Sequence, residues 1–127
     1  MTNVESRRIR LKVGDLELSG VLNATATADK LWSELPIDAS GNTWGDEIYF
    51  RTSIEAEEED AREVVDLGDI GYWPPGQALC LFYGPTPASR GDEIRPASAV
   101  NIIGKMDGDA TVLKGVSSGV RVVIEKA

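Results

Sequence analysis

Three chemically active side chains alternate along one short segment of the chain. Glu47, Tyr49 and Arg51 occupy every second position, with apolar Ile48 and Phe50 between them. In a β-strand such alternate residues share one face and stand about 7 Å apart. A carboxylate, a phenol and a guanidinium on one face could orient a polar ligand or a peptide carbonyl. The alternative is a solvated outer face with an ordinary surface ion pair, and spacing alone favours that alternative.

A second candidate is the aromatic pair that precedes two prolines, Tyr72-Trp73-Pro74-Pro75. Proline disfavours the α region for the residue before it, so Trp73 is predicted to be extended. A rigid turn that presents Tyr72 and Trp73 would suit stacking on an apolar or proline-like ligand. It is equally consistent with a loop that folds its aromatics over the end of a barrel.

Uncharged polar side chains are scattered over the predicted loops and strand ends. They are Asn42, Thr43, Gln77, Ser89, Ser98 and Asn101. Such residues commonly hydrogen-bond to the backbone of turns, and that role is favoured over ligand contact. Gln77 and Asn101 are nevertheless kept as candidate ligand-binding residues beside the aromatic and charged groups.

What the chain lacks narrows its chemistry. It has no histidine, which excludes Ser-His-Asp and Cys-His catalysis and imidazole zinc sites. Its one cysteine, Cys80, lies in an apolar run and is predicted to be a small core residue rather than a nucleophile. The acidic run Glu55–Glu63 lacks the spacing of a calcium loop and predicts a solvated loop or short exposed helix. No phosphate-binding glycine motif is present, so we expect neither a metal nor a cofactor.

Length and charge set the class of protein. The chain has 127 residues, a net charge of −8 and a pI near 4.5, and we expect one domain over residues 1–127. An anionic surface disfavours nucleic acid and anionic membranes as partners. Met1–Arg10 shows no apolar signal-peptide segment, so a soluble cytoplasmic protein is expected. The oligomeric state cannot be read from the sequence.

Periodicity predicts a mainly β protein with one clear helix. Arg7–Val13 and Leu16–Leu22 alternate around Gly14-Asp15 and predict a hairpin. A helix is expected over roughly Ala26–Leu35, capped by Thr25 or Thr27, with Pro36 ending it. The other expected elements are strands at Ile37–Asn42, Asp46–Thr52, Ala78–Tyr83, Ala99–Met106 and Val120–Glu125, a long loop at Gly84–Pro96, and a possible second short helix at Asp109–Gly115. Many short strands with one helix indicate a closed or nearly closed β-barrel.

Three segments resemble the small prokaryotic cyclophilin-like proteins, atypical members of the cyclophilin fold. They are Asn42–Phe50, Gly68–Gly76 and Pro96–Asn101. The resemblance covers nearly the whole chain and implies a closed eight-stranded barrel, mostly antiparallel, with helices at its ends. True cyclophilins isomerise X-Pro bonds on the outer barrel face, and the resemblance places Arg51 at the position of their strand arginine. Thr52–Glu55 lacks the proline-glycine turn, phenylalanine-methionine pair and glutamine that follow this arginine in cyclophilins.

Three functional hypotheses follow. The first is a module that binds a small molecule or a proline-containing peptide, without efficient isomerase activity, in a groove bounded by Tyr49, Arg51, Tyr72 and Trp73. The second is a peptidyl-prolyl isomerase in which Arg51 hydrogen-bonds near the prolyl nitrogen. The third is a protein-interaction domain whose acidic segment Glu55–Glu63 contacts a basic partner.

Overall fold

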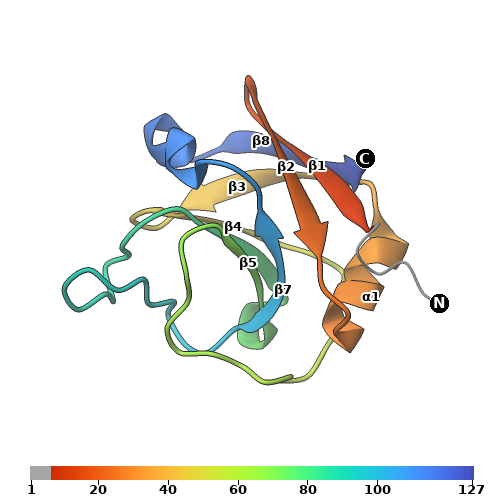
Figure 1. Cartoon of the computed structure of the whole chain (residues 1–127), viewed down its shortest axis with the longest axis horizontal. Helices are drawn as coiled ribbons and strands as arrows, with labels where there is room; N and C mark the ends of the chain where they lie inside the picture. Colours follow the sequence, from red (N-terminus) through yellow and green to blue (C-terminus); the bar gives the residue numbers. More distant parts are fainter. Residues whose placement is uncertain (1–6) are drawn as a thin grey trace.

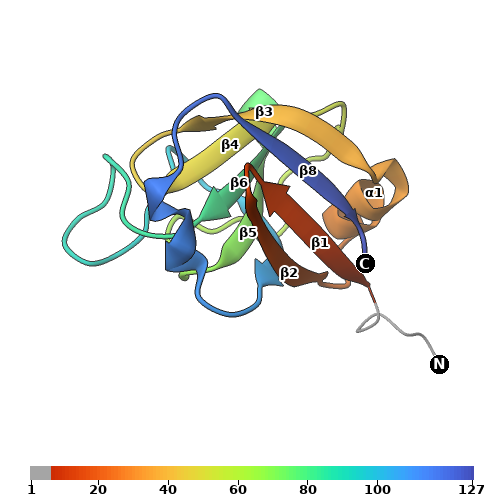
Figure 2. The ribbon, with the colours of Figure 1, turned by 90° about the horizontal axis from the view of Figure 1, so that it is seen from above.

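The computed structural model describes residues 7–127, whose eight strands form a closed barrel. Figures 1 and 2 show how the strands are arranged in two views. The strands are β1 (Arg8–Val13), β2 (Leu16–Leu22), β3 (Ile37–Thr43), β4 (Glu47–Arg51), β5 (Asp69–Trp73), β6 (Ala78–Phe82), β7 (Asn101–Met106) and β8 (Val120–Lys126). They follow one another around the barrel in the order β1-β2-β7-β5-β6-β4-β3-β8. Every neighbouring pair is antiparallel. The predicted closed, mainly β barrel is therefore confirmed.

The two ends of the chain close the barrel. β1 pairs with β2 as the predicted hairpin, with Gly14 at a φ of 58° in the turn. β8 lies between β1 and β3 and pairs with both. A sheet closed in this way leaves no unpaired edge strand.

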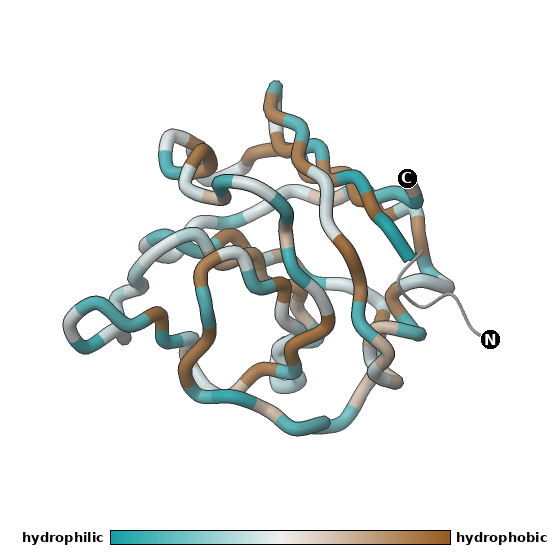
Figure 3. Tube along the Cα trace, in the orientation of Figure 1, coloured by the Kyte–Doolittle hydropathy of each residue, from teal (hydrophilic) through white to brown (hydrophobic). Residues whose placement is uncertain are grey.

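The main core fills the inside of the barrel. Ile9, Leu11 and Val13 of β1 alternate with exposed or half-buried neighbours, and Val122 and Ile124 of β8 do the same. Figure 3 shows this alternation as changes of colour along the strands. Alternate residues face opposite sides of a sheet, so the period-2 pattern in the sequence predicted these inward positions correctly.

One α-helix, α1 (Ala26–Glu34), lies at the end of the barrel near the C-terminus, as Figure 2 shows. The Thr25 side chain accepts a hydrogen bond from the Ala28 amide, so Thr25 is the N-cap. The Glu59 carboxylate also accepts from the amides of Ala26 and Thr27, at 2.9 Å each. The acidic segment forms a loop without helix, and one of its carboxylates serves the fold rather than facing solvent.

Two short 3-10 helices complete the elements, at Pro74–Gly76 and Ala110–Gly115. The second matches the short helix expected at Asp109–Gly115. Within residues 7–127, none of the helices has the length and apolar character needed to cross a bilayer.

A second, smaller apolar cluster lies on the outside of the barrel. It consists of Val65, Cys80, Phe82, Ile94 and Val100, with Trp73 and Ile102 packed against it. Two segments between strands cover the sheet here and meet through backbone bridges at Arg62–Val100 and Val65–Ile94. This covering turns part of the outer sheet face into an interior surface.

Candidate functional site

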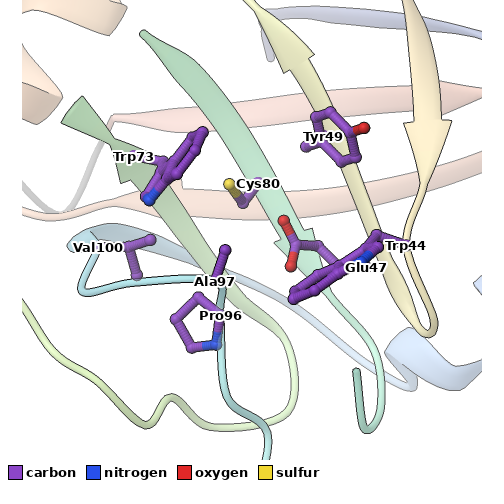
Figure 4. Close-up of a pocket in the computed structure, with 8 residues that line it drawn as sticks. All are labelled: Trp44, Glu47, Tyr49, Trp73, Cys80, Pro96, Ala97 and Val100. Carbon is purple, nitrogen blue, oxygen red and sulfur yellow. The ribbon is translucent and has the colours of Figure 1, made fainter. Parts of the chain in front are cut away.

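A pocket of about 300 Å³ opens beside this outer cluster (Figure 4). The lining residues come from β4, β5, β6, the β3–β4 turn and the segment before β7. They are Trp44, Glu47, Tyr49, Trp73, Cys80, Pro96, Ala97 and Val100. Figure 4 shows Trp73 on one side, Tyr49 and Trp44 on the other, and the carboxyl group of Glu47 between them. The walls are apolar and aromatic, with one ionisable carboxyl group among them.

Glu47 stands on the outer face of β4 because its neighbour Ile48 points into the barrel core. The solvated outer face that the spacing favoured is therefore a wrong prediction for this residue, since only 5% of Glu47 is exposed. Its Oε1 atom is buried and accepts no hydrogen bond from any described residue. A buried polar atom without a partner is costly, so it marks a position that a ligand donor could complete.

Burial also changes the proton affinity of this group. The loss of solvation disfavours the carboxylate and raises the pKa of Glu47 to about 7, while the nearby Cys80 thiol partly opposes the rise. Glu47 therefore changes charge near neutral pH. A carboxyl group in this environment can donate a proton when neutral and attract a cation when ionised.

Cys80 forms part of the pocket floor at the centre of β6. Its side chain is 2% exposed, as the sequence predicted for a core cysteine. Burial raises the pKa of Cys80 well above that of a free thiol, and the adjacent Glu47 raises it further. The nucleophilic thiolate is disfavoured in this setting, which agrees with a packing role.

Trp73 is held in place by its own turn and by the segment before β7. Its backbone is extended, with φ −102° and ψ 103°, as predicted for a residue before proline. The indole lies so close to Gly76 that a Cβ there would come within 2.6 Å of two of its ring carbons. The Nε1–H group donates to Ser98 Oγ at 2.6 Å. Any larger residue at position 76 would push the ring out of place.

The β3–β4 turn carries Trp44 and docks the long loop that covers the sheet. Gly45 has a φ of 61°, and a Cβ there would lie 2.7 Å from the Pro87 ring. The Asp46 amide donates to the Pro85 carbonyl at 2.9 Å. These contacts attach the loop to the rim of the pocket.

The structure brings three of the predicted site residues together. Glu47, Tyr49 and Trp73 line the same pocket, and Tyr49 is 36% exposed at its mouth. Arg51, the weak catalytic candidate, is exposed on the same strand face but does not line this pocket. It donates instead to Gln77 Oε1 at 3.3 Å, and Gln77 does not line the pocket either.

The other two predicted residues are buried elsewhere. Tyr72 points into the barrel, and its hydroxyl donates to the Ile54 carbonyl at 2.6 Å. The groove expected between Tyr49, Arg51, Tyr72 and Trp73 is thus wrong in including Tyr72, because adjacent strand residues face opposite sides. Asn101 is buried and hydrogen-bonds to Thr27 Oγ1, the Glu57 carbonyl and the Glu59 amide. These bonds give it the backbone-supporting role that was favoured for such residues.

Five pocket residues were not among the predicted ligand contacts: Trp44, Cys80, Pro96, Ala97 and Val100. Of these five, Trp44 could have been predicted from the sequence, because it lies just before Asp46–Thr52, the predicted strand that carries Glu47. Pro96, Ala97 and Val100 belong to a segment that carried the family resemblance, but no periodicity indicates that this segment folds back over β6. Among residues 7–127, no group of three or more histidine, cysteine or acidic side chains is arranged to hold a metal ion.

The closed barrel and its pocket on the outer sheet face define the class of the protein as a cyclophilin-type barrel. The model of the cyclophilin-like family matches residues 7–125, and the chain belongs to this family. A comparison with curated proteins yields no match.

A solved structure of an archaeal protein shares this fold. It is the solution structure of a hypothetical protein from Archaeoglobus fulgidus, 44% identical, with a TM-score of 0.82. The alignment covers 99% of this chain and 98% of that protein. That protein is described as hypothetical, so the comparison establishes fold and kinship.

Proposed function

We propose that this protein is a small-ligand-binding module that holds its ligand in the outer-face pocket, without efficient prolyl isomerase activity. The observation that carries the proposal is the unpartnered Glu47 Oε1 beside the aromatic walls. Ligand sites are typically apolar concavities with a few polar groups that fix orientation. The pocket volume of about 300 Å³ lies at the lower end of such sites, which favours a small molecule or a single side chain of a peptide.

The position of Arg51 gives less support to isomerisation. Catalysis by a strand arginine requires that the guanidinium and an apolar proline pocket act on the same peptide bond. Here the guanidinium contacts Gln77 and does not line the pocket. Binding in the pocket therefore has better geometric support than prolyl isomerisation.

The acidic segment likewise gives limited support to an interaction domain. Glu59 accepts hydrogen bonds at the start of α1, and the Glu55 carbonyl accepts from Lys30 Nζ at 2.6 Å. These contacts give part of the acidic segment a structural role in holding α1.

Binding can be tested with the three tryptophan indoles as reporters. Trp44 and Trp73 line the pocket, whereas Trp32 lies on α1 with Lys126 Nζ 4.6 Å from its ring centre. In NMR spectra recorded with a library of small fragments, we expect binders to shift the Nε1–H signals of Trp44 and Trp73 and to leave Trp32 unchanged. A library that shifts neither pocket signal, or all three alike, would contradict the proposal.

The isomerase hypothesis has its own decisive assay. The uncatalysed cis/trans barrier is about 18–20 kcal/mol, so even a modest reduction is measurable with a proline peptide. We expect the wild type and Arg51→Ala to match the uncatalysed rate. If the wild type accelerates isomerisation and Arg51→Ala abolishes the acceleration, the protein is an isomerase. The proposal of a binding module without efficient isomerase activity would then be wrong.

A further inference from the structure

The pocket combines a carboxyl group with three aromatic rings and no basic side chain. Trp44, Tyr49 and Trp73 surround the space next to the carboxyl group of Glu47, as Figure 4 shows. Aromatic faces attract cations, because the ring quadrupole is negative above the plane. Both features favour a positively charged occupant over an anion.

We propose that the ligand of this pocket is a protonated alkylamine whose ammonium group donates a hydrogen bond to Glu47 Oε1 while its carbon atoms pack against the aromatic walls. This inference deepens the proposed function and rests on it. It names the ligand chemistry that would satisfy the unpartnered atom.

An ammonium ligand fits better than the two alternatives. A neutral apolar ligand would leave Oε1 buried without a donor, which is costly. A quaternary ammonium ion would meet the aromatic rings and the charge but could not donate to Oε1. A protonated amine meets all of these requirements, since it supplies charge and N–H donors together.

The charge state of the pocket makes the inference testable by pH. The ammonium group of an alkylamine resembles that of lysine, with a pKa of about 10.4, and stays charged below about pH 9. The titratable groups near Glu47 are the Cys80 thiol and the Tyr49 phenol, which line the same pocket, and the Tyr83 phenol, which belongs to the barrel core. Burial raises the pKa of Cys80 well above its ordinary value and raises the pKa of Tyr83 to about 12. Neighbouring Asp46 pairs with Lys114 Nζ at 3.5 Å. Near neutral pH, the expected titration is that of Glu47.

The experiment compares isobutylammonium with isobutanol, its neutral analogue of the same shape, by NMR titration of the Trp44 and Trp73 indole signals. At about pH 8 we expect isobutylammonium to bind at least ~10-fold more tightly than isobutanol, which corresponds to a charge-assisted hydrogen bond. Ionisation of a group with a pKa of about 7 predicts that isobutylammonium affinity falls between about pH 8 and pH 5.5, by up to roughly 30-fold if only the ionised carboxylate binds it. The affinity for isobutanol should not fall in this way.

A matched pair of variants isolates the carboxyl group. Glu47→Gln keeps the shape of the side chain and removes its charge, so it should abolish both the preference for isobutylammonium and its pH dependence. Glu58→Gln removes one carboxylate from an exposed position outside the pocket and should preserve both. Because the pH titration uses the wild type, the test does not depend on the folding of either variant.

Two further ligands define the chemistry. Tetramethylammonium carries charge without an N–H donor and should bind more weakly than isobutylammonium. A short lysine peptide with blocked ends distinguishes a protein side chain from a free amine as the source of the ammonium group.

Equal affinity for isobutylammonium and isobutanol, or an ammonium affinity that does not change with pH, would overturn the inference. If neutral fragments still shift Trp44 and Trp73 in that case, the proposed binding function stands without it. If no compound shifts either signal, both fail.

Discussion

Glu47 brings together the cost of burial and the capacity to recognise a ligand in one side chain. A carboxyl group removed from water without a full set of donors is destabilising as a carboxylate. The fold reduces this cost by holding the proton, which is why the pKa of Glu47 rises to about 7. A group that costs stability when charged and lies in a pocket is a frequent sign of function.

This cost predicts a stability difference that depends on pH. The pKa of Glu47 is raised in the folded state, from an ordinary value of 4.5 to about 7. The folded state therefore binds the proton more tightly, and wild-type stability falls as pH rises from about 4.5 to 7. Glu47→Gln cannot ionise, so its stability relative to wild type should rise across this window by up to about 3 kcal/mol. Urea unfolding at about pH 5, 6, 7 and 8 measures the change.

The control for this experiment is Glu58→Gln, which makes the same substitution at an exposed position. Its stability relative to wild type should vary little over the same window. A constant difference between Glu47→Gln and wild type from about pH 5 to 8 would show that burial does not raise the pKa of Glu47.

Residue-level prediction succeeded where alternation alone decides the outcome. It placed Ile48 and Phe50 on one face of the strand and Glu47 and Tyr49 on the other, and the structure shows the first pair inside the barrel. The same rule excludes Tyr72 from any outer groove that contains Trp73, because the two are consecutive in β5. The burial of Glu47 could not be predicted this way, since it depends on a distant segment that covers the strand.

At the level of elements, the segment between β6 and β7 is more than a surface connection. Its sequence, rich in proline and glycine, predicted an exposed loop, and Gly91 is indeed exposed. However, Thr86, Ile94 and Pro96 are buried, and the Thr86 hydroxyl donates to the Arg95 carbonyl. Isolated apolar residues in a loop have no periodicity, so their partners become apparent only when the chain is folded.

Ile94 anchors this loop and provides a prediction about its local opening. Its side chain is 7% exposed, and its carbonyl accepts from the Val65 amide at 2.9 Å. Ile94→Ala should cost about 2 kcal/mol or more in the outer cluster. If the loop opens as a unit, hydrogen exchange at the Val65, Arg62 and Val100 amides should accelerate roughly 30-fold, with much smaller changes in β1 and β8.

The matched variant is Ile103→Ala, which removes the same atoms from a fully buried position in the main core. This change should accelerate exchange throughout the barrel. An Ile94→Ala variant with the same uniform pattern would mean that the loop and barrel unfold only together. The outer loop would then not open as a unit separate from the barrel.

At the scale of the whole molecule, the barrel and the pocket rest on different parts of the chain. The barrel closes where β8 meets β1, and the Ala127 amide donates to the Arg8 carbonyl at 3.0 Å. The pocket depends on the outer loop between β6 and β7. This loop is attached to the β3–β4 turn and, through the Arg62 and Val65 bridges, to the segment between β4 and β5. Closure could be predicted from strand patterns and family resemblance, whereas the pocket depends on contacts distant in sequence.

Circular permutation tests whether the two are separable. Ala127 can be joined to Arg7 by a short glycine-serine linker, because the described ends of the chain are adjacent. New ends at Gly108 or at Gly91 both fall on exposed turns, where an added Cβ would meet no atom within 4 Å. Chain breaks at such sites are usually tolerated, so both permutants should keep the barrel. Their free energies of unfolding should lie within about 1–2 kcal/mol of that of the parent protein.

The permutants should differ at the pocket. Ends at Gly91 divide the outer loop into two tails and increase the entropic cost of holding Ser98 against Trp73. The Trp73 Nε1–H signal should therefore move away from its parent position in the Gly91 permutant and stay there in the Gly108 permutant. Because this indole donates to Ser98 Oγ, its shift reports the loop contact without any ligand. Loss of the barrel in the Gly91 permutant alone would instead show that the outer loop is needed for closure, and that the barrel and the pocket form one cooperative structure.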